Sequence, residues 1–339
     1  MPYISPGPGD VHVNRPLTNI AIAYMQDDSV FVADKVFPNI PVTKQSDAFF
    51  VYERGAWNRD DMKDRAPGTE SAGSSYDIDQ NVYYARVKAL HKDIPDQVAD
   101  NTDNPINNDR DATNFVSFKA LINREVNFAA KYLKDGVWTF RVDGVAAAPT
   151  AKASFNVADM ANNDVLKWTD GASTPIEDVS YAATGMQLRT GFRPNKMILS
   201  RPVFDVLKNH PDIIARMDRG QTTGPAQASK ETLAALFEVD EVLVMEGIYN
   251  AAQQGIAEAN QFIAGKTALL VYSAPAPGLL VPSAGYTFSW TGRYGNSERG
   301  VRIKRFRIER LEVTRVEAQQ AYDQRLIGAD LGVFFKDII

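Results

Sequence analysis

The chain has 339 residues with a net charge of −5, no cysteine and only three histidines. The lack of cysteine excludes disulfides, thiol nucleophiles and thiolate metal sites, and three histidines far apart in the sequence argue against a histidine-rich metal site. Hydrophobic residues make up 44% and charged residues 23%, which is typical of a globular protein. No run approaches the about 18–20 apolar residues of a membrane helix, so we expect no membrane partner.

The beginning of the chain predicts extended structure. Residues 1–16 are rich in proline and glycine and predict an extended arm, and Thr18–Gln26 predicts a short helix. Val36–Val42 predicts an extended edge, because each proline fixes its own φ and biases the preceding residue towards the β region.

Two predicted strands enclose a long polar segment. Ala48–Tyr52 and Val82–Leu90 predict strands from their β-branched and aromatic residues. Residues 53–81 between them are dense in charge, glycine and serine, with Trp57 as the one expected buried anchor. Hairpin loops normally have about 2–5 residues. We therefore expect this segment to be disordered or held by another molecule.

A long helix is predicted over residues 110–135. Asp109 or Asp111 would cap its beginning, and Gly136 would follow its end. Apolar residues at steps of three and four predict its buried face, namely Phe115, Phe118, Ile122, Val126, Ala129 and Leu133.

The second half predicts alternating helices and strands. Thr174, Pro175 and Glu177 form a predicted capping box for a helix that ends before Gly191. Further elements are expected as a strand at Lys196–Leu199, a helix from Ser200 closed by Pro211, a flexible stretch at 219–225, a helix from Ser229 to Leu236, and strands at Glu241–Met245 and Ala268–Tyr272. Val301–Val316 predicts one strand-like tail with two bulges.

No motif anchors catalysis. Gly265-Lys266-Thr267 lacks the upstream glycine and the following helix of a phosphate loop, so we interpret it as a turn into a strand. The aspartates between 96 and 111 lack the glycine turn of a calcium loop and predict a solvated loop with a helix cap. His91 and His210 have no recognisable partner and are interpreted as structural. We expect no catalytic residue, metal ion or cofactor.

Basic residues concentrate near the end of the chain. The candidate basic strand face consists of Arg302, Lys304, Arg305, Arg307 and Arg310. One interpretation is a stripe that faces nucleic-acid phosphates. The other, which the acidic remainder of the chain favours, is an exposed strand that pairs with nearby glutamates or with a neighbouring subunit.

Taken in order, these elements resemble a tailed-bacteriophage major capsid protein of the HK97-like fold. The strand-to-helix stretch 193–211 and the helix-to-strand stretch 233–244 are each similar to segments of these proteins. The resemblance implies an α+β fold with an N-terminal arm at 1–45, an extended E-loop hairpin at 46–93, a peripheral domain at 94–175 with spine helix 110–135, an axial α/β domain at 176–300, and C-terminal strands at 301–339.

The resemblance also implies a function. The chain would self-assemble into the hexamers and pentamers of an icosahedral head that encloses double-stranded DNA. Expected partners are further copies of itself, a separate scaffolding protein, a portal, a decoration protein and non-specifically bound DNA. The expected location is the virion, with assembly in the host cytoplasm.

Charged residues of the E-loop are the candidate inter-subunit contacts: Glu53, Arg54, Arg59, Asp60, Asp61, Lys63, Asp64 and Arg65. Their alternating signs would fix the register between subunits. Lys63 lies in the loop where some relatives form isopeptide cross-links, but the sequence identifies no partner for it. Two alternatives stay open, an encapsulin-like protein compartment and a soluble α/β enzyme with an unrecognised carboxylate site.

Overall fold

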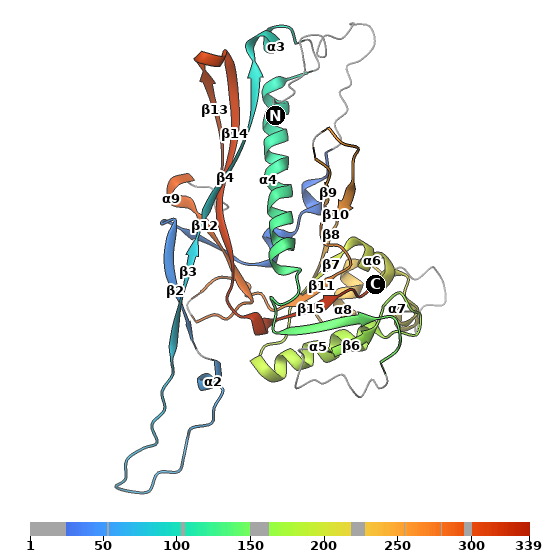
Figure 1. Ribbon diagram of the computed structural model, residues 1–339. Helices are drawn as coiled ribbons and strands as arrows, with labels where there is room; N and C mark the ends of the chain where they lie inside the picture. Colours follow the sequence, from blue (N-terminus) through green and yellow to red (C-terminus); the bar gives the residue numbers. More distant parts are fainter. Residues whose placement is uncertain are drawn as a thin grey trace.

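The computed structural model describes residues 25–52, 54–102, 106–149, 163–217, 228–253, 255–278, 280–294 and 300–339. The expected arm at 1–16, the expected flexible stretch at 219–225 and most of the expected helix Thr18–Gln26 lie outside these ranges. Within them, helices and strands combine into an α+β fold with two larger sheets and two small two-stranded ribbons (Figure 1).

The larger of the two sheets has six strands. Its order is β6 (Asn163–Leu166), β5 (Phe140–Val145), β15 (Gly332–Lys336), β11 (Ala268–Val271), β7 (Lys196–Ser200) and β8 (Glu241–Met245). Its central strands are continuous apolar runs, as expected of strands buried on both faces. Strand alternation divides them between two cores: Met197 and Leu199 face one, and Ile198 faces the other.

Short helices cover one face of this sheet, and the end of a long helix covers the other. The first group comprises α5 (Pro175–Thr190), α6 (Arg201–Lys208), α7 (Pro211–Met217) and α8 (Lys230–Leu236). Phe128, Ala129 and Tyr132 of α4 (Asn108–Tyr132) pack on the opposite face together with α1 (Ala33–Val36), which follows η1 (Asp28–Val30).

The five-stranded sheet is organised around one long strand, β14. It comprises β1 (Asn39–Val42), β12 (Gly285–Trp290), β14 (Val313–Leu326), β13 (Val301–Ile308) and β4 (Arg86–Pro95). Strand β14 is antiparallel to all three of its neighbours: β13 and β4 pair with its first part, residues 313–320 and 313–322, and β12 pairs with its last part, residues 322–326. Helix α4 lies along this sheet, and Ala112 and Val116 pack against Ile94, Val316 and Ala318 (Figure 1).

The remaining elements lie outside these two sheets. Strands β2 (Ser46–Tyr52) and β3 (Ile78–Tyr84) form an antiparallel ribbon, with α2 (Arg54–Trp57) directly after β2. The others are α3 (Asp96–Asp100), β9 (Ile248–Asn250), β10 (Asn260–Phe262), α9 (Thr291–Tyr294), η3 (Glu309–Leu311) and η4 (Ala329–Leu331).

Two strand predictions require correction. The strand expected at Val82–Leu90 is two strands that separate at Ala85, a fully buried residue whose N–H donates to the Gln45 carbonyl. The tail expected as one bulged strand is the hairpin β13–β14. Its chain reverses at 309–312, where Glu312 has a left-handed φ of 49°. The second apparent bulge is therefore the turn of this hairpin.

The long helix was predicted in the right place, but of its predicted buried face Ala129 is buried whereas Phe115 is exposed and the others are partly buried. Its N-cap is Asn107, whose side chain accepts a hydrogen bond from the Arg110 N–H, rather than Asp109 or Asp111. The buried residues are Ala112, Val116, Arg124, Glu125, Phe128, Ala129 and Tyr132. Phe115 is 46% exposed. Small and polar residues face inward because the sheet packs closely there and because Arg124 and Glu125 find buried partners.

Helix α5 begins and ends where the sequence predicted, but without the capping box. Thr174 is the N-cap residue, yet its buried hydroxyl has no hydrogen-bond partner among the described residues. Gly191 ends the helix with a φ of 78°, the left-handed conformation that glycine adopts without strain.

We predict that Gly332→Ala destabilises the protein more than Gly191→Ala. A Cβ at Gly332 would lie 2.3 Å from two ring atoms of Trp138, whose indole N–H is fixed by a 2.7 Å bond to the Tyr132 carbonyl. Overpacking of this kind costs about 1–3 kcal/mol, and we expect the upper end here because the ring cannot move. A Cβ at Gly191 meets open space, so the change costs about 1 kcal/mol of backbone strain.

Urea unfolding of unassembled subunits, with the two variants beside the wild type, measures both costs. If Gly332→Ala lowered the free energy of unfolding no more than Gly191→Ala does, the packing of Trp138 against β15 would be contradicted.

Candidate assembly surfaces

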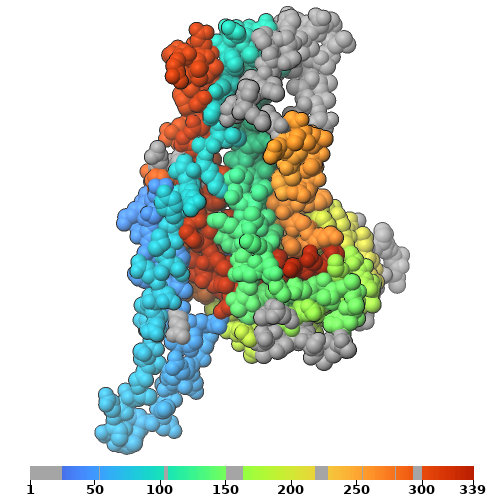
Figure 2. Space-filling view, in the orientation of Figure 1, coloured from blue at the N-terminus to red at the C-terminus, as the bar shows by residue number. Residues whose placement is uncertain are grey.

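The β2–β3 ribbon and the loop that joins its strands project away from the body of the molecule (Figures 1 and 2). The predicted contact residues lie at its base and along its loop. Arg54 pairs with Asp330 of the body. Arg59 pairs with Asp61 at 3.8 Å, and the Arg65 guanidinium donates to the Thr69 carbonyl. Arg59, Asp61 and Arg65 therefore already have partners within the loop.

Three of the predicted loop charges point into solvent. Asp60, Lys63 and Asp64 are exposed and make no ion pair with any described residue. Glu53 lies outside the described residues. The structure therefore brings Arg59 and Asp61 together but leaves Asp60, Lys63 and Asp64 available for another chain.

An aromatic cluster holds the two sides of the loop together near its base. The rings of Tyr52, Trp57 and Tyr76 contact one another with centroid separations of 5.5–6.0 Å. Trp57 is nevertheless 57% exposed, so the expectation that it is a buried anchor was wrong. It packs against neighbours in its own loop because the body of the protein does not reach this far.

The two faces of the ribbon differ in their partners. Phe49 and Tyr83 point towards the body, and both rings stack on Phe288. The opposite face exposes an apolar stripe, here called the outer stripe, which consists of Phe50, Ile78, Val82 and Tyr84. Phe50 is 66% exposed and Val82 55%. Sequence reasoning missed this stripe because it concentrated on the charges, although the alternation within each strand carried the signal.

The candidate basic strand face divides between two sides of strand β13. Arg305 pairs with Asp109 at 2.8 Å, and Arg307 pairs with Asp96 at 2.7 Å and also with Glu309. The hydrogen bonds that the Arg307 guanidinium donates to the Glu309 and Asp96 carboxylates raise the pKa of Arg307. Strand alternation places Arg302 and Lys304 on the other side of β13. Arg310 is exposed in the turn that follows.

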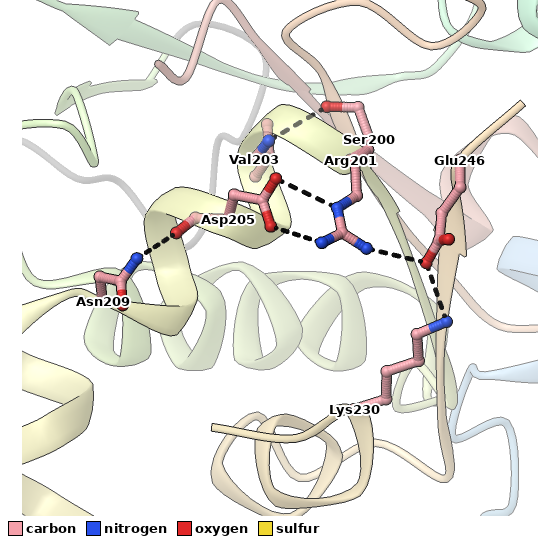
Figure 3. A network of polar contacts seen from close by, with 7 residues as sticks. All are labelled: Ser200, Arg201, Val203, Asp205, Asn209, Lys230 and Glu246. Carbon is pink, nitrogen blue, oxygen red and sulfur yellow. Dashed lines mark hydrogen bonds and ion pairs between the residues drawn. The ribbon is translucent and has the colours of Figure 1, made fainter. Parts of the chain in front are cut away.

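A charged network joins two helices beside the six-stranded sheet (Figure 3). The Ser200 hydroxyl caps α6 by accepting from the Val203 N–H, and Arg201 in the same turn pairs with Asp205 at 3.0 Å and with Glu246 at 3.3 Å. Hydrogen bonding to Asp205 raises the pKa of Arg201. Lys230 of α8 reaches Glu246 at 3.2 Å. Because each charge is paired inside the chain, this network stabilises the fold rather than forming a binding site.

His210 and Ser173 form a buried pair that invites comparison with a nucleophile and its base. The His210 Nε2 lies 2.9 Å from the Ser173 hydroxyl, and both side chains are buried. However, the Asp212 N–H donates to Nδ1, and the Ser173 hydroxyl donates to the Asp170 carbonyl. This network assigns the proton to Nε2, which therefore donates to Ser173 and cannot accept its proton. The pair fastens the 170–173 turn to α7 and has the geometry of a structural contact.

The other chemical motifs have structural explanations as well. Gly265 has a left-handed φ of 62° in a turn, and strand β11 follows Lys266 where a phosphate loop needs a helix. The described ranges contain no group of three or more His, Cys, Asp or Glu side chains placed to hold a metal ion. Among the helices that the structure describes, none is long and apolar enough to cross a membrane.

Comparisons with known proteins agree with this architecture. The family model described as phage major capsid protein E matches residues 152–284. The major capsid protein of Pseudomonas phage JBD67 is 24% identical over 329 residues, which cover 96% of this chain and 97% of that protein.

Solved structures show the same fold. A phage-related protein from Bordetella bronchiseptica superposes with a TM-score of 0.64 and 20% identity, covering 93% of this chain and 94% of its own. The capsid structure of cyanophage P-SCSP1u gives a TM-score of 0.57 and 11% identity, covering 96% of this chain and 93% of that one.

In sequence the chain is similar to phage major capsid proteins, which are structural proteins, and its fold is that of solved phage capsid structures. Within this class the resemblance is to the phage major capsid protein. That prediction from the sequence is confirmed, and so is the α+β capsid fold.

We predict that His210→Ala lowers the free energy of unfolding by about 1–3 kcal/mol, because Ser173 and the Asp212 N–H each lose a buried hydrogen-bond partner. His91→Ala is the matched control, since His91 is only partly buried on β4 and should change stability little. Thermal unfolding of subunits measures both. A His210→Ala subunit as stable as the wild type would contradict the structural role of this histidine.

Proposed function

We propose that this chain is the building block of an icosahedral phage head, in which copies form hexamers and pentamers around double-stranded DNA. The observation that carries the proposal is the similarity to a phage major capsid protein along 96% of the chain. The projecting ribbon supports it, because an arm without a core of its own is suited to lie on a neighbouring subunit.

We propose the following domains for this shell subunit. Residues 1–45 would be the N-terminal arm, 46–93 the E-loop, 94–175 the peripheral domain with the spine helix, 176–300 the axial domain, and 301–339 the returning C-terminal strands. The location of α4 along the five-stranded sheet supports a rigid peripheral arm, and the six-stranded sheet with its covering helices supports a separate axial unit. Strands β5, β6 and β15 of the six-stranded sheet lie outside 176–300 and β12 of the five-stranded sheet lies within it, so the chain crosses between the two units more often than these sequence ranges do.

The ribbon would contact the next subunit in two ways. Its outer stripe offers apolar side chains that would be removed from water on assembly, at about 25 cal/mol per Å². The loop charges, Asp60, Lys63 and Asp64 above all, would orient the contact, since charge complementarity contributes more to specificity than to affinity.

The phosphates of the packaged DNA would contact basic side chains that have no acidic partner among the described residues. Arg302, Lys304 and Arg310 are the best candidates among the basic residues of the C-terminal strands, because no described acidic side chain pairs with them. Arg305 and Arg307 are engaged with Asp109 and Asp96 and would contribute less. We further propose a separate scaffolding protein, a portal and a decoration protein as partners, assembly in the host cytoplasm, and a final location in the virion.

Negative-stain microscopy and sedimentation of the purified full chain test the proposed function. We expect rings, capsomers or closed shells, and shells from infected or lysogenic cells should contain double-stranded DNA. A small compact oligomer under all conditions would contradict the shell, and shells that hold protein in place of nucleic acid would favour the encapsulin-like alternative.

We predict that Val82→Asp prevents assembly without unfolding the subunit. Val82 is exposed on the outer stripe, so the new carboxylate is hydrated in the free subunit but would be desolvated at a subunit contact, which costs several kcal/mol per unpaired charge. Asn81→Asp is the matched control, because it adds a similar charge one residue away on the other face of the ribbon.

Sedimentation reports assembly of the two variants, and circular dichroism reports folding. Normal assembly of Val82→Asp, or an equal defect in both variants, would contradict the outer stripe as a subunit contact.

A further inference from the structure

A group of buried polar side chains lies on the last part of strand β14 and on its neighbour β12. Gln324 of β14 and its direct cross-strand partner Thr287 are each 1% exposed. Tyr322 is 5% exposed and lies two residues before Gln324, so strand alternation places both side chains on one face of the sheet. Opposed side chains of an antiparallel pair have Cβ atoms about 4.5–5.5 Å apart. The side chains of Gln324, Thr287 and Tyr322 are therefore close neighbours, here called the polar cluster.

The polar cluster points towards helix α4. The Arg124 guanidinium of α4 lies 4.6 Å from the centre of the Tyr322 ring. Two residues before Thr287, and on the same face of β12, Gly285 lies so close to Phe37 that a Cβ there would be 3.0 Å from two of its ring atoms. The polar cluster is therefore enclosed by α4 and by the apolar core around Phe37, away from bulk water.

Four polar atoms of the polar cluster have no hydrogen-bond partner among the described residues. They are the amide nitrogen and the amide oxygen of Gln324, the Thr287 hydroxyl and the Tyr322 hydroxyl. Burial raises the pKa of Tyr322 to about 12, although the charge of Arg124 acts the other way, so its hydroxyl stays neutral near neutral pH. A buried polar group without a partner is costly, because it has given up its hydrogen bonds to water. Four such atoms side by side therefore indicate a ligand that pairs with them.

The chemistry of these groups fits a neutral ligand. The Gln324 amide offers two donors and one acceptor, and each hydroxyl can donate and accept. The polar cluster contains no carboxylate that could bind a metal ion, and the nearby charge of Arg124 is already paired with Asp34. A water molecule both donates and accepts, and buried waters make about three hydrogen bonds to polar groups that are otherwise unpaired. Water therefore suits the polar cluster better than an ion does.

We propose that the polar cluster is an internal hydration site, in which ordered water bridges Gln324, Thr287 and Tyr322 and joins strand β14 to β12 beneath helix α4. The bound water would be part of the fold of each subunit, whether free or assembled. This inference does not depend on the shell proposed above, because every group in it belongs to one chain.

A structure of the purified full chain at a resolution that shows ordered solvent tests the site directly. We expect a solvent peak within hydrogen-bond distance of the Gln324 amide and of at least one of the Thr287 and Tyr322 hydroxyls. Direct hydrogen bonds between the Gln324 amide and both hydroxyls, or another segment of the chain in place of the solvent, would overturn the proposal.

Magnetic relaxation dispersion of water nuclei tests the site in solution on unassembled subunits, because it counts internal waters with long residence times. Gln324→Met removes both amide groups at a similar side-chain length, so this variant should hold at least one long-lived water fewer than the wild type. Gln261→Met makes the same change at an exposed position of β10 and should leave the count unchanged.

The same measurement can overturn the proposal. An equal count of long-lived waters in Gln324→Met and the wild type would do so. If Gln324→Met does not fold, Thr287→Val decides in its place. It removes one hydroxyl from the polar cluster and must shorten the residence time of the bound water, so an unchanged residence time would overturn the proposal.

Discussion

The buried carboxylate of Asp323 on β14 is the point at which the projecting parts of this subunit are joined to its body. It accepts from the Tyr84 N–H at 3.0 Å, which fixes the end of the ribbon, and from Arg325 at 2.6 Å. Lys131 of α4 approaches it at 3.4 Å. Loss of this carboxylate would leave the Tyr84 N–H without its acceptor, so the contact helps to fix the direction in which the ribbon leaves the body. On β14, Asp323 pairs with Phe288 of β12, and the preceding residue Tyr322 pairs with Arg86 of β4.

Beyond that junction, the ribbon has little to support it. Phe49 and Tyr83 still reach Phe288, but Trp57 packs only with the aromatic rings of its own loop. A single chain therefore exposes apolar side chains that a globular protein would normally bury. In the proposed shell, this exposed apolar surface would become contact area between subunits. The segment 31–37 shows the opposite arrangement, since Glu125 accepts hydrogen bonds from its backbone and Phe37 packs on Phe128 of the same chain.

Local signals in the sequence were sufficient where local contacts decide the structure. Ser200 and Ser229 cap their helices as the sequence indicates, and Gly191 ends α5 in the left-handed conformation. The inward face of α4 could not be predicted, because Ala112 and Val116 are buried by Val316 and Ala318 from the other end of the chain. The break at Ala85 was missed for the same reason, since the pairing of β4 with the distant β14 decides it. The reversal at Glu312 is local, but it was missed because a glutamate rather than a glycine adopts the left-handed conformation in the turn. Among the candidate contact residues, the sequence located the loop but could not tell that Arg305 is already paired with Asp109 whereas Lys63 is exposed.

The central claim is that the ribbon is firmly attached at Asp323 and is completed by a second copy of the chain. Hydrogen exchange compared between isolated subunits and assembled shells tests it most directly. The Tyr84 amide should be equally protected in both states, because its acceptor lies in the same chain. The amides of residues 58–77 should exchange quickly in the subunit and become protected on assembly. Equal exchange of these loop amides in the two states would contradict the account.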